Sequence, residues 1–386
     1  GSIPFCSLKK LPSRVPGKKH TTTLSGAAIS DKFTTVKIIR KLYPPLTIHR
    51  RPPKNLGPGE IQYFGGPELT FVTPESNFVY YKNAIVTHHG IILKGLTLQK
   101  NLIVSYDVDL KHYRFRFLAH VLLKLKKITL SQTNKYVLIF DNYSGPKGLA
   151  HWYSDSLTRL VEIKDEIKDH IALVPWYYQK NKFIAESLEL FGITNIQVIE
   201  EGCKVKVPNL YVAQHIAPSG NFNPENVKKL RDFIWSKNKL DLKFSLGERI
   251  YISRSRAEFR YVINDTEVAE LLKTYGFSVV YMEDYDLAQK VSVVYNAKYM
   301  VSIIGAAFSF VHFMRPGSSI MEFRKRNDGV NCIYWALADA LDINYYYQYG
   351  DARVHHMGSY NFDLTMDVAL LEKNIQQMLH TNGETI

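Results

Sequence analysis

Short apolar runs alternate with segments of helical period along most of the chain. The runs YVLIFDN, HIALVPW and IQVIEEG indicate buried strands, with helices expected to begin near Trp152 and Asn181 between them. A second series has RIYISR, FSVVYME, YMVSII and SSIMEF as strands, and its helices are expected over 265–276, 286–297 and 306–314. Strands and helices that alternate in this way are typical of βαβ units on a parallel sheet. The chain is therefore predicted to be an α/β protein.

The same pattern divides the 386 residues into three regions. Residues 1–68 are rich in Pro, Gly and basic residues, which predicts an extended N-terminal arm. Residues 69–245 open with short strands expected at LTFVTP, NFVYYKNAIVTHHGIILKG and LIVSYD. They continue into the first alternating series, and a polar stretch, DLKFSLGE, marks its end. Residues 246–386 contain the second series. Two α/β domains of this size leave a cleft, and ligands of such sheets bind at the carboxyl ends of the strands.

Charge and cysteine content narrow the possible partners. The chain has 49 Lys and Arg against 36 Asp and Glu, a net charge of +13, which favours an anionic partner such as a nucleic acid, a membrane surface or a phosphorylated small molecule. Three distant cysteines, Cys6, Cys203 and Cys332, suggest neither a zinc site nor a disulfide framework. The most apolar stretch, residues 301–314, is too short to span a bilayer.

Three arginines follow the first strand of the second series. Arg254, Arg256 and Arg260 are well placed to bind a phosphate bidentately, and the alternative is a surface loop with solvated charges. Asn264 and Glu267, three residues apart, predict a capping box that opens the next helix.

The other strand ends of this half also carry candidate residues. Gly305 and Ala306 lie at a strand-to-helix turn, where a ligand can approach the backbone and an anion can meet free N–H groups. Glu283 and Glu322 end neighbouring strands and could accept hydrogen bonds from ribose hydroxyls, although a capping role is an equal alternative. Asp286, in the DYD stretch, is interpreted as part of a helix N-terminus rather than of a metal site.

In the first half, His151 and Asp155 lie four residues apart where a helix begins, and therefore share one face. Asp155 could act as a general base, with His151 orienting it or contacting the substrate. The alternative is a structural pair, in which the histidine packs under the loop and the aspartate caps the helix. The adjacent histidines 88–89 and 355–356 are not read as metal sites, since neighbouring residues of a strand face opposite ways.

Several blocks of this sequence resemble, in order, the signature blocks of the family 61 glycosyltransferases. They are HWYSDSLTRL, KNKFIAESLELFGI, GNFNP, YISRSRAEFRYVIND with TEVAELL, GFSVVYMED, and DLAQKVSVVYNAKYMVSIIGAAFSFVHFMRPGSSIMEF. The resemblance covers about residues 69–323. The family includes bacterial capsule and lipopolysaccharide transferases, plant xylan transferases and animal O-glycan transferases. The resemblance implies a GT-B architecture of two Rossmann-like domains, a UDP-sugar donor held mainly by the second, and inversion at the anomeric carbon without a required metal. As an open alternative, the last helix crosses back to the first domain.

The resemblance also implies roles for single residues. His151 and Asp155 match the family's HW-x-x-D element, which is expected to supply the base that activates the acceptor. Arg254 and Arg260 match arginines of the block that is expected to reach the donor phosphates, and Arg256 lies between them without a firm match.

Two further matches concern the donor side. Glu283 matches the acid that ends the next strand, and Gly305 matches the glycine of a block usually written HGAGLTN. In this chain Ile304 replaces the histidine of that block, and residues 308–310 replace LTN.

The predicted function is inverting transfer of a sugar from a nucleotide donor, a UDP-sugar, to a hydroxyl of a glycan or glycoconjugate, as in polysaccharide biosynthesis. Asp155 is the expected base, and no metal or other cofactor is expected. A catalytically inactive homologue that binds nucleotide sugar or glycan is the alternative, because of Ile304. A nucleic-acid-binding protein ranks third, since only the net charge supports it and no recognition motif does.

The expected location is the cytoplasm, with peripheral association at the inner membrane face. Few cysteines and the lack of an apolar signal core in the first residues favour this location. The secretory lumen is the alternative, because the sequons at Asn142 and Asn264 permit it.

Overall fold

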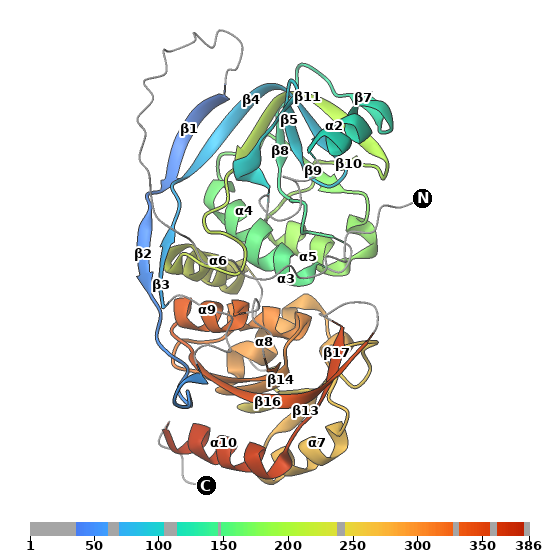
Figure 1. Ribbon diagram of the computed structural model, residues 1–386. Coiled ribbons are helices and arrows are strands. Elements are labelled where there is room, and N and C mark those ends of the chain that lie inside the picture. The colour runs from blue at the N-terminus through green and yellow to red at the C-terminus, as the bar shows by residue number, and fades with distance from the viewer. Residues whose placement is uncertain are drawn as a thin grey trace, which may run out of the picture.

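The computed structural model describes residues 36–60, 69–103, 114–145, 148–237, 244–326, 332–355 and 361–381. In this part of the chain two large sheets lie one above the other, with a layer of helices between them (Figure 1). The predicted α/β class is confirmed.

The first sheet has nine described strands in the order β10-β9-β8-β11-β4-β5-β6, with β1 beside β4 and β7 beside β11. Their bounds are β1 Val36–Tyr43, β4 Ser76–Thr87, β5 Ile92–Lys94, β6 Thr97–Leu98, β7 Lys126–Thr129, β8 Tyr136–Leu138, β9 Ile171–Pro175, β10 Ile196–Ile199 and β11 Cys203–Ala213. Strands β8, β9 and β10 lie where the apolar runs predict them, and they pair in parallel. Strand β11 joins this parallel part to the antiparallel strand β4.

The second sheet has six described strands in the order β13-β12-β14-β15-β16-β17. Their bounds are β12 Arg249–Ile252, β13 Ser278–Val280, β14 Tyr299–Ile303, β15 Ser319–Lys325, β16 Asn344–Val354 and β17 Phe362–Thr365. All pairs are parallel except the antiparallel pair β16 and β17. The chain order reverses at β12, which lies between β13 and β14. Such a switch point is where doubly wound sheets bind ligands, outside the carboxyl ends of the strands.

Helices of both halves meet in the layer between the sheets (Figure 1). The first half contributes α3 Leu149–His151, the π-helical stretch η3 Trp152–Leu157, α4 Thr158–Ile163, α5 Lys182–Leu190 and α6 Pro224–Lys237. The second contributes α8 Leu287–Asn296, the 3₁₀ helix η6 Ala306–Phe313 and α9 Ile333–Ala340. Helix η6 contacts α3, η3 and α6, and α5 contacts α8. A single apolar core runs through this layer, where the Tyr153 ring packs 5.8 Å from Phe310 and 5.6 Å from Phe313.

The remaining helices lie outside this layer. They are α2 Arg114–Leu123, α7 Asp265–Thr274, α10 Val368–Thr381 and the short 3₁₀ turns η2 Lys100–Leu102, η4 Tyr178–Lys180 and η5 Met282–Asp284. Helix α10 packs against α7 and β16, on the face of the second sheet away from the first (Figure 1). The open alternative that the last helix crosses back is therefore wrong. None of the helices in the described ranges is long and apolar enough to cross a membrane.

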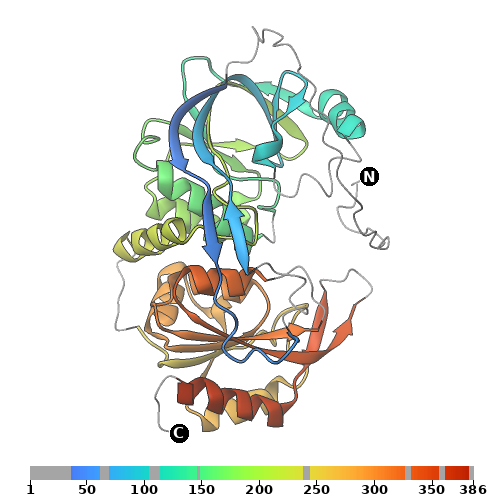
Figure 2. The same ribbon diagram turned by 60° about the vertical axis from the view of Figure 1, so that its left-hand side comes forward.

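The described part of the predicted arm connects the two halves (Figure 2). Strand β1 pairs with β4, and β2 Leu46–His49 pairs with β3 Thr70–Thr73. Beyond β2, Arg51 Nε donates to Asp339 in α9 (2.8 Å), and the Lys54 amide donates to the Tyr345 carbonyl in β16 (2.8 Å). The arm thus supplies a strand to the first sheet, which its Pro-rich composition did not predict. Residues 1–35 and 61–68 lie outside the described residues, and the three predicted boundaries stay predictions.

One predicted cap is wrong and another is confirmed. Asn264 precedes α7 but makes no side-chain cap bond, because its amide group exchanges two 2.9 Å hydrogen bonds with the backbone of Met366. Asp286 instead caps α8 in a capping box with Gln289, as expected for a helix N-terminus. The strand expected at LIVSYD is not formed at Leu102, which ends η2, and residues 104–107 lie outside the described residues.

Candidate active site

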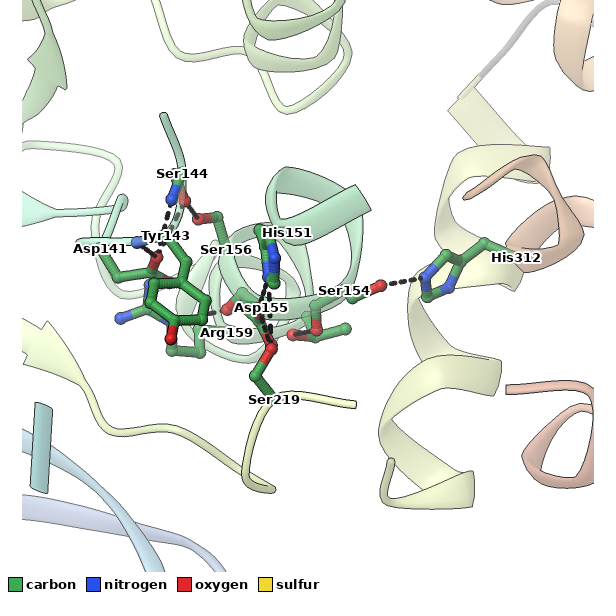
Figure 3. A network of polar contacts seen from close by, with 11 residues as sticks. Asp141, Tyr143, Ser144, His151, Ser154, Asp155, Ser156, Arg159, Ser219 and His312 are labelled. Atoms are coloured by element: carbon green, nitrogen blue, oxygen red, sulfur yellow. Dashed lines mark hydrogen bonds and ion pairs between the residues drawn. The ribbon is translucent and has the colours of Figure 1, made fainter. Parts of the chain in front are cut away.

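The predicted pair His151 and Asp155 is hydrogen-bonded. His151 Nδ1 lies 2.8 Å from Asp155 Oδ2, and Ser219 Oγ donates to the same oxygen at 2.9 Å (Figure 3). Ser219 Oγ also lies 3.2 Å from His151 Nδ1. The three side chains therefore form one polar cluster around a single carboxylate oxygen.

A π-helical turn carries this cluster. His151 ends α3, and Asp155 lies within η3, before the helix returns to α geometry in α4. Single π turns inside α-helices are rare and occur frequently at functional sites. The sequence predicted that the two residues share a helix face, but its spacing did not reveal the π turn.

The two partners differ in exposure and in the direction of their pKa shifts. The His151 side chain is 30% exposed and the Asp155 side chain 5%. Burial alone would raise the pKa of Asp155, but the hydrogen bond and charge of His151 hold it below 3.8. Burial would lower the pKa of His151, but the hydrogen bond and charge of Asp155 raise it above 6.5. The pair therefore favours an ionised carboxylate and a histidine that titrates above its ordinary range.

Buried side chains fix the helix against the preceding loop. Arg159 Nε donates to the Asp155 carbonyl (2.7 Å), and its Nη2 donates to Asp141 Oδ2 (3.0 Å). Asp141 Oδ1 accepts from the backbone amides of Tyr143 (2.9 Å) and Ser144 (3.0 Å). Sequence reasoning missed Asp141, Arg159 and Ser219. Asp141 had a usable signal, since it closely follows a buried strand.

A small pocket opens beside Asp155. Its lining residues are Ser154, Asp155, Thr158, His215, Ile216, Ala217, Asn221, Phe222, Asn223 and Asn226. Burial, together with the Arg159 charge, lowers the pKa of His215 to about 4, so its imidazole is neutral near pH 7. The His215 Nε2 atom is buried and has no hydrogen-bond partner among the described residues. A pocket with these polar groups suits a hydroxyl group.

One hydrogen bond joins this helix to the second half. Ser154 Oγ lies 3.1 Å from His312 Nε2, which projects from η6 (Figure 3). Burial lowers the pKa of His312 to about 3, so this contact is between neutral groups. Because η6 begins directly after Gly305, one short helix connects the predicted base to the predicted phosphate turn.

Arg254 and Gly305 lie together at the switch point, since they follow the adjacent strands β12 and β14. A Cβ atom at Gly305 would lie 3.1 Å from Arg254 Cζ, so the guanidinium group covers the glycine backbone. Arg254 Nε donates to the Arg260 carbonyl (2.8 Å), and Nη2 donates to the Phe259 carbonyl (3.3 Å). Burial and the Arg260 charge both lower the pKa of Arg254.

Arg260 brings a second cation to this place. Its backbone has φ 59°, a left-handed conformation uncommon for residues other than glycine. Its Nε atom is buried without a hydrogen-bond partner, and neither Arg254 nor Arg260 forms an ion pair with a described carboxylate. Two neighbouring cations without such a pair favour an anion.

The His151–Asp155 pair and the Arg254–Arg260 pair both lie within one family match. Residues 149–321 match the family model Glycosyltransferase 61. The chain contains a glycosyltransferase 61 domain. The match runs from the first residue of α3 into β15 and includes His151, Asp155, Arg254 and Gly305. No curated protein matches the chain. A domain of this family indicates a glycosyltransferase, which acts on a sugar donor and an acceptor.

The remaining predicted residues of the glycosyltransferase 61 domain lie apart from the arginine pair or only at its edge. Arg256 is exposed, donates to Asp284 Oδ1 (2.7 Å) and stacks 3.8 Å above the Tyr281 ring. Glu283 is exposed in η5 rather than at a strand end, and its charge acts on Arg254. Ala306 is the first residue of η6, beside Gly305.

Glu322 is placed differently from the expectation. It lies inside β15 rather than at its end and is fully buried. Its Oε2 accepts from the Tyr345 hydroxyl (2.5 Å) and lies 4.0 Å from Arg324 Nη1. These contacts belong to the core of the second sheet, so we do not include Glu322 in the donor site.

The described residues contain no group of three or more His, Cys, Asp or Glu side chains that could hold a metal ion. The expectation of a metal-independent reaction stays a prediction. The side chain of Ile304, which the sequence resemblance aligns with a histidine of the family, is buried.

Proposed function

We propose that the glycosyltransferase 61 domain transfers a sugar, with inversion, from a UDP-sugar to a hydroxyl of a glycan or glycoconjugate. One observation carries the proposal: the His151–Asp155 pair and the Arg254–Arg260 pair are connected through η6. The two facing sheets are consistent with a GT-B architecture.

The geometry favours His151 as the base, with Asp155 orienting it, which reverses the roles expected from the sequence. Asp155 Oδ2 accepts hydrogen bonds inside the protein, and its lowered pKa makes it a weak base. His151 Nδ1 is held by that carboxylate, which leaves Nε2 of a partly exposed ring for the acceptor. A base whose pKa lies near the working pH is the most effective.

The proposed step is a single displacement. The acceptor hydroxyl gives its proton to His151 Nε2, while its oxygen forms a bond to the anomeric carbon. The bond between that carbon and the phosphate oxygen breaks on the opposite face, and the nucleoside diphosphate leaves with the electron pair. Arg254 and Arg260, at the switch point, would stabilise the negative charge that develops on the leaving group.

The acceptor is proposed to present its reacting hydroxyl to His151 Nε2 and to place a neighbouring hydroxyl near the pocket beside Asp155. His215 and Ser154 offer neutral polar groups there. The arginine cations would stabilise the leaving group, so the proposed step includes no metal ion.

The test has two stages. The full chain is first screened by thermal shift with UDP-, GDP- and CMP-sugars, and stabilisation by UDP-sugars is expected. UDP release from each stabilising donor is then measured with a panel of sugar and glycan acceptors, with the variant His151→Ala/Asp155→Asn as background. Transfer above that background supports the proposal. Donor binding without turnover on any acceptor would instead support the inactive homologue suggested by Ile304.

A further inference from the structure

A separate small core holds α2 against the β5–β6 hairpin, at the end of the first sheet far from the second (Figures 1 and 2). The residues of this core are Ile91, Leu93, Leu98, Ile103, Val121 and Leu125. We call residues 91–103 and 118–127 the leucine–lysine cap.

Three leucines of the cap point into solvent. Leu123 is 81% exposed and Leu96 is 66% exposed, the two highest values among the large apolar side chains of the described residues, and Leu122 is 40% exposed. Leu96 lies in the turn between β5 and β6, and the other two end α2. Isolated exposed leucines need no explanation, but three on adjoining elements of one small core do.

A buried lysine fixes the end of α2. Lys204 of β11 donates from Nζ to the carbonyls of Val121 (2.7 Å) and Leu122 (2.8 Å). These bonds satisfy carbonyl groups that the last turn of a helix otherwise leaves free. The two terminal leucines are therefore presented on a fixed helix end.

The residues that define the cap carry charge of one sign. Lys94, Lys100, Lys124, Lys126 and Lys127 all lie within it, whereas residues 91–103 and 114–140 contain no Asp or Glu. Lys124, Lys126 and Lys127 are exposed and form no ion pair with a described carboxylate. Asp107 and Asp109 belong to residues 104–113, between the two parts of the cap and outside the described residues, and Glu200 and Glu201 precede β11, which pairs with β7.

We propose that the leucine–lysine cap docks on an anionic lipid bilayer. Exposed leucines insert into the boundary between headgroups and acyl chains, and lysines around them are attracted by anionic headgroups. A polynucleotide would use the lysines but would leave the leucines in water. A second copy of the cap would bring like charges together. The bilayer is the partner that uses both features, and this proposal does not depend on the reaction.

The test is co-sedimentation of the full chain with vesicles. One set is phosphatidylcholine alone, and the other contains one phosphatidylserine for every two phosphatidylcholine molecules. Binding to the second set only is expected, with weakening at high salt. Leu96→Ser/Leu123→Ser should lower the partition coefficient about tenfold or more, because two apolar side chains no longer enter the bilayer. Lys124→Gln/Lys127→Gln should lower it about fivefold for each lysine.

Matched controls come from the second half of the chain. Val354→Ser removes an exposed apolar side chain, and Lys273→Gln/Lys373→Gln removes two exposed lysines, so neither should change vesicle binding. The leucine double variant should retain any affinity for a polynucleotide, since its charge is unchanged. The proposal is overturned if the wild type does not bind phosphatidylserine vesicles, or if the leucine double variant binds them as well as the wild type.

Discussion

Two polar sites, a first place around His151 and a second place around Gly305, differ in how their charges are neutralised. Around His151, the buried acids Asp141 and Asp155 each have a cationic or polar partner inside the protein. Around Gly305, Arg254 and Arg260 lie together without a described carboxylate in ion-pair contact. The first place is organised before any substrate arrives, as a catalytic base requires. The second would be balanced by a bound anion, as we propose for the donor.

The largest effect is expected from variants that disrupt the first place, around His151. Asp155→Asn keeps the size of the side chain but removes the charge that orients and supports His151, and His151→Ala removes the imidazole itself. Each variant should lower kcat by roughly 10²- to 10⁴-fold, the usual contribution of general-base catalysis. Initial rates with a saturating UDP-sugar measure this loss.

Donor affinity is the control for both variants. If the comparison is right, calorimetric titration with UDP gives nearly the wild-type Kd in each, because the phosphates bind elsewhere. A Kd that rises as strongly as kcat falls would show that the two places are not separate. A larger loss in Asp155→Asn than in His151→Ala would return the role of base to the carboxylate.

The second prediction concerns variants that disrupt the second place, around Gly305. Arg254→Ala and Arg260→Ala each remove a charge-assisted contact, which should weaken UDP binding by about 1.5–3 kcal/mol. Arg256→Ala is a matched control, because that arginine is exposed and paired with Asp284. Equal losses in all three variants would mean that overall charge, not the switch point, binds the donor.

The sequence predicted the local part of both places. Apolar runs located β8–β10 and β12–β15, and the four-residue spacing correctly put His151 and Asp155 on one face. The central strand β11 was missed, since its apolar positions are interrupted by lysines and Pro208.

The environments of the other predicted residues depend on contacts between residues distant in the chain. Arg256 and Arg260 look alike in the sequence, but a left-handed backbone at Arg260 and an ion pair at Arg256 separate them. The sequence predicted Glu322 at the end of a strand. The structure places it inside β15, and both the pairing with β16 and the hydrogen bond from Tyr345 join residues distant in the chain. A pattern of neighbouring residues contains no information on such partners.

The third prediction sharpens the comparison through pH. In the wild type, activity should rise with pH as His151 loses its proton, at a pKa above 6.5. Asp155→Asn removes the charge that helps to raise this pKa and weakens the hydrogen bond, because a neutral amide oxygen accepts less strongly, and it leaves burial, which lowers the pKa. The acid limb of the residual kcat/KM profile should therefore move to lower pH. An unmoved limb would mean that another group titrates.

The smallest expected effect concerns the glycine beneath the arginine. Gly305→Ala places a methyl group 3.1 Å from Arg254 Cζ and Nε, closer than ordinary van der Waals contact, so the guanidinium group must shift. The backbone itself is not strained by the change, because φ 165° is an extended conformation. Arg254 is a flexible side chain and can move by a few tenths of an ångström, so UDP affinity should fall only about threefold to tenfold, within the range of modest contact losses.

A double-mutant cycle with Arg254→Ala tests the cause of this loss, since the effects of residues in contact are coupled whereas those of distant residues add. If the methyl group acts by displacing the arginine, Gly305→Ala has little further effect in the Arg254→Ala background. If the two losses add in full, the glycine serves the donor through its own backbone, and the second place has two independent contacts with the anion rather than one.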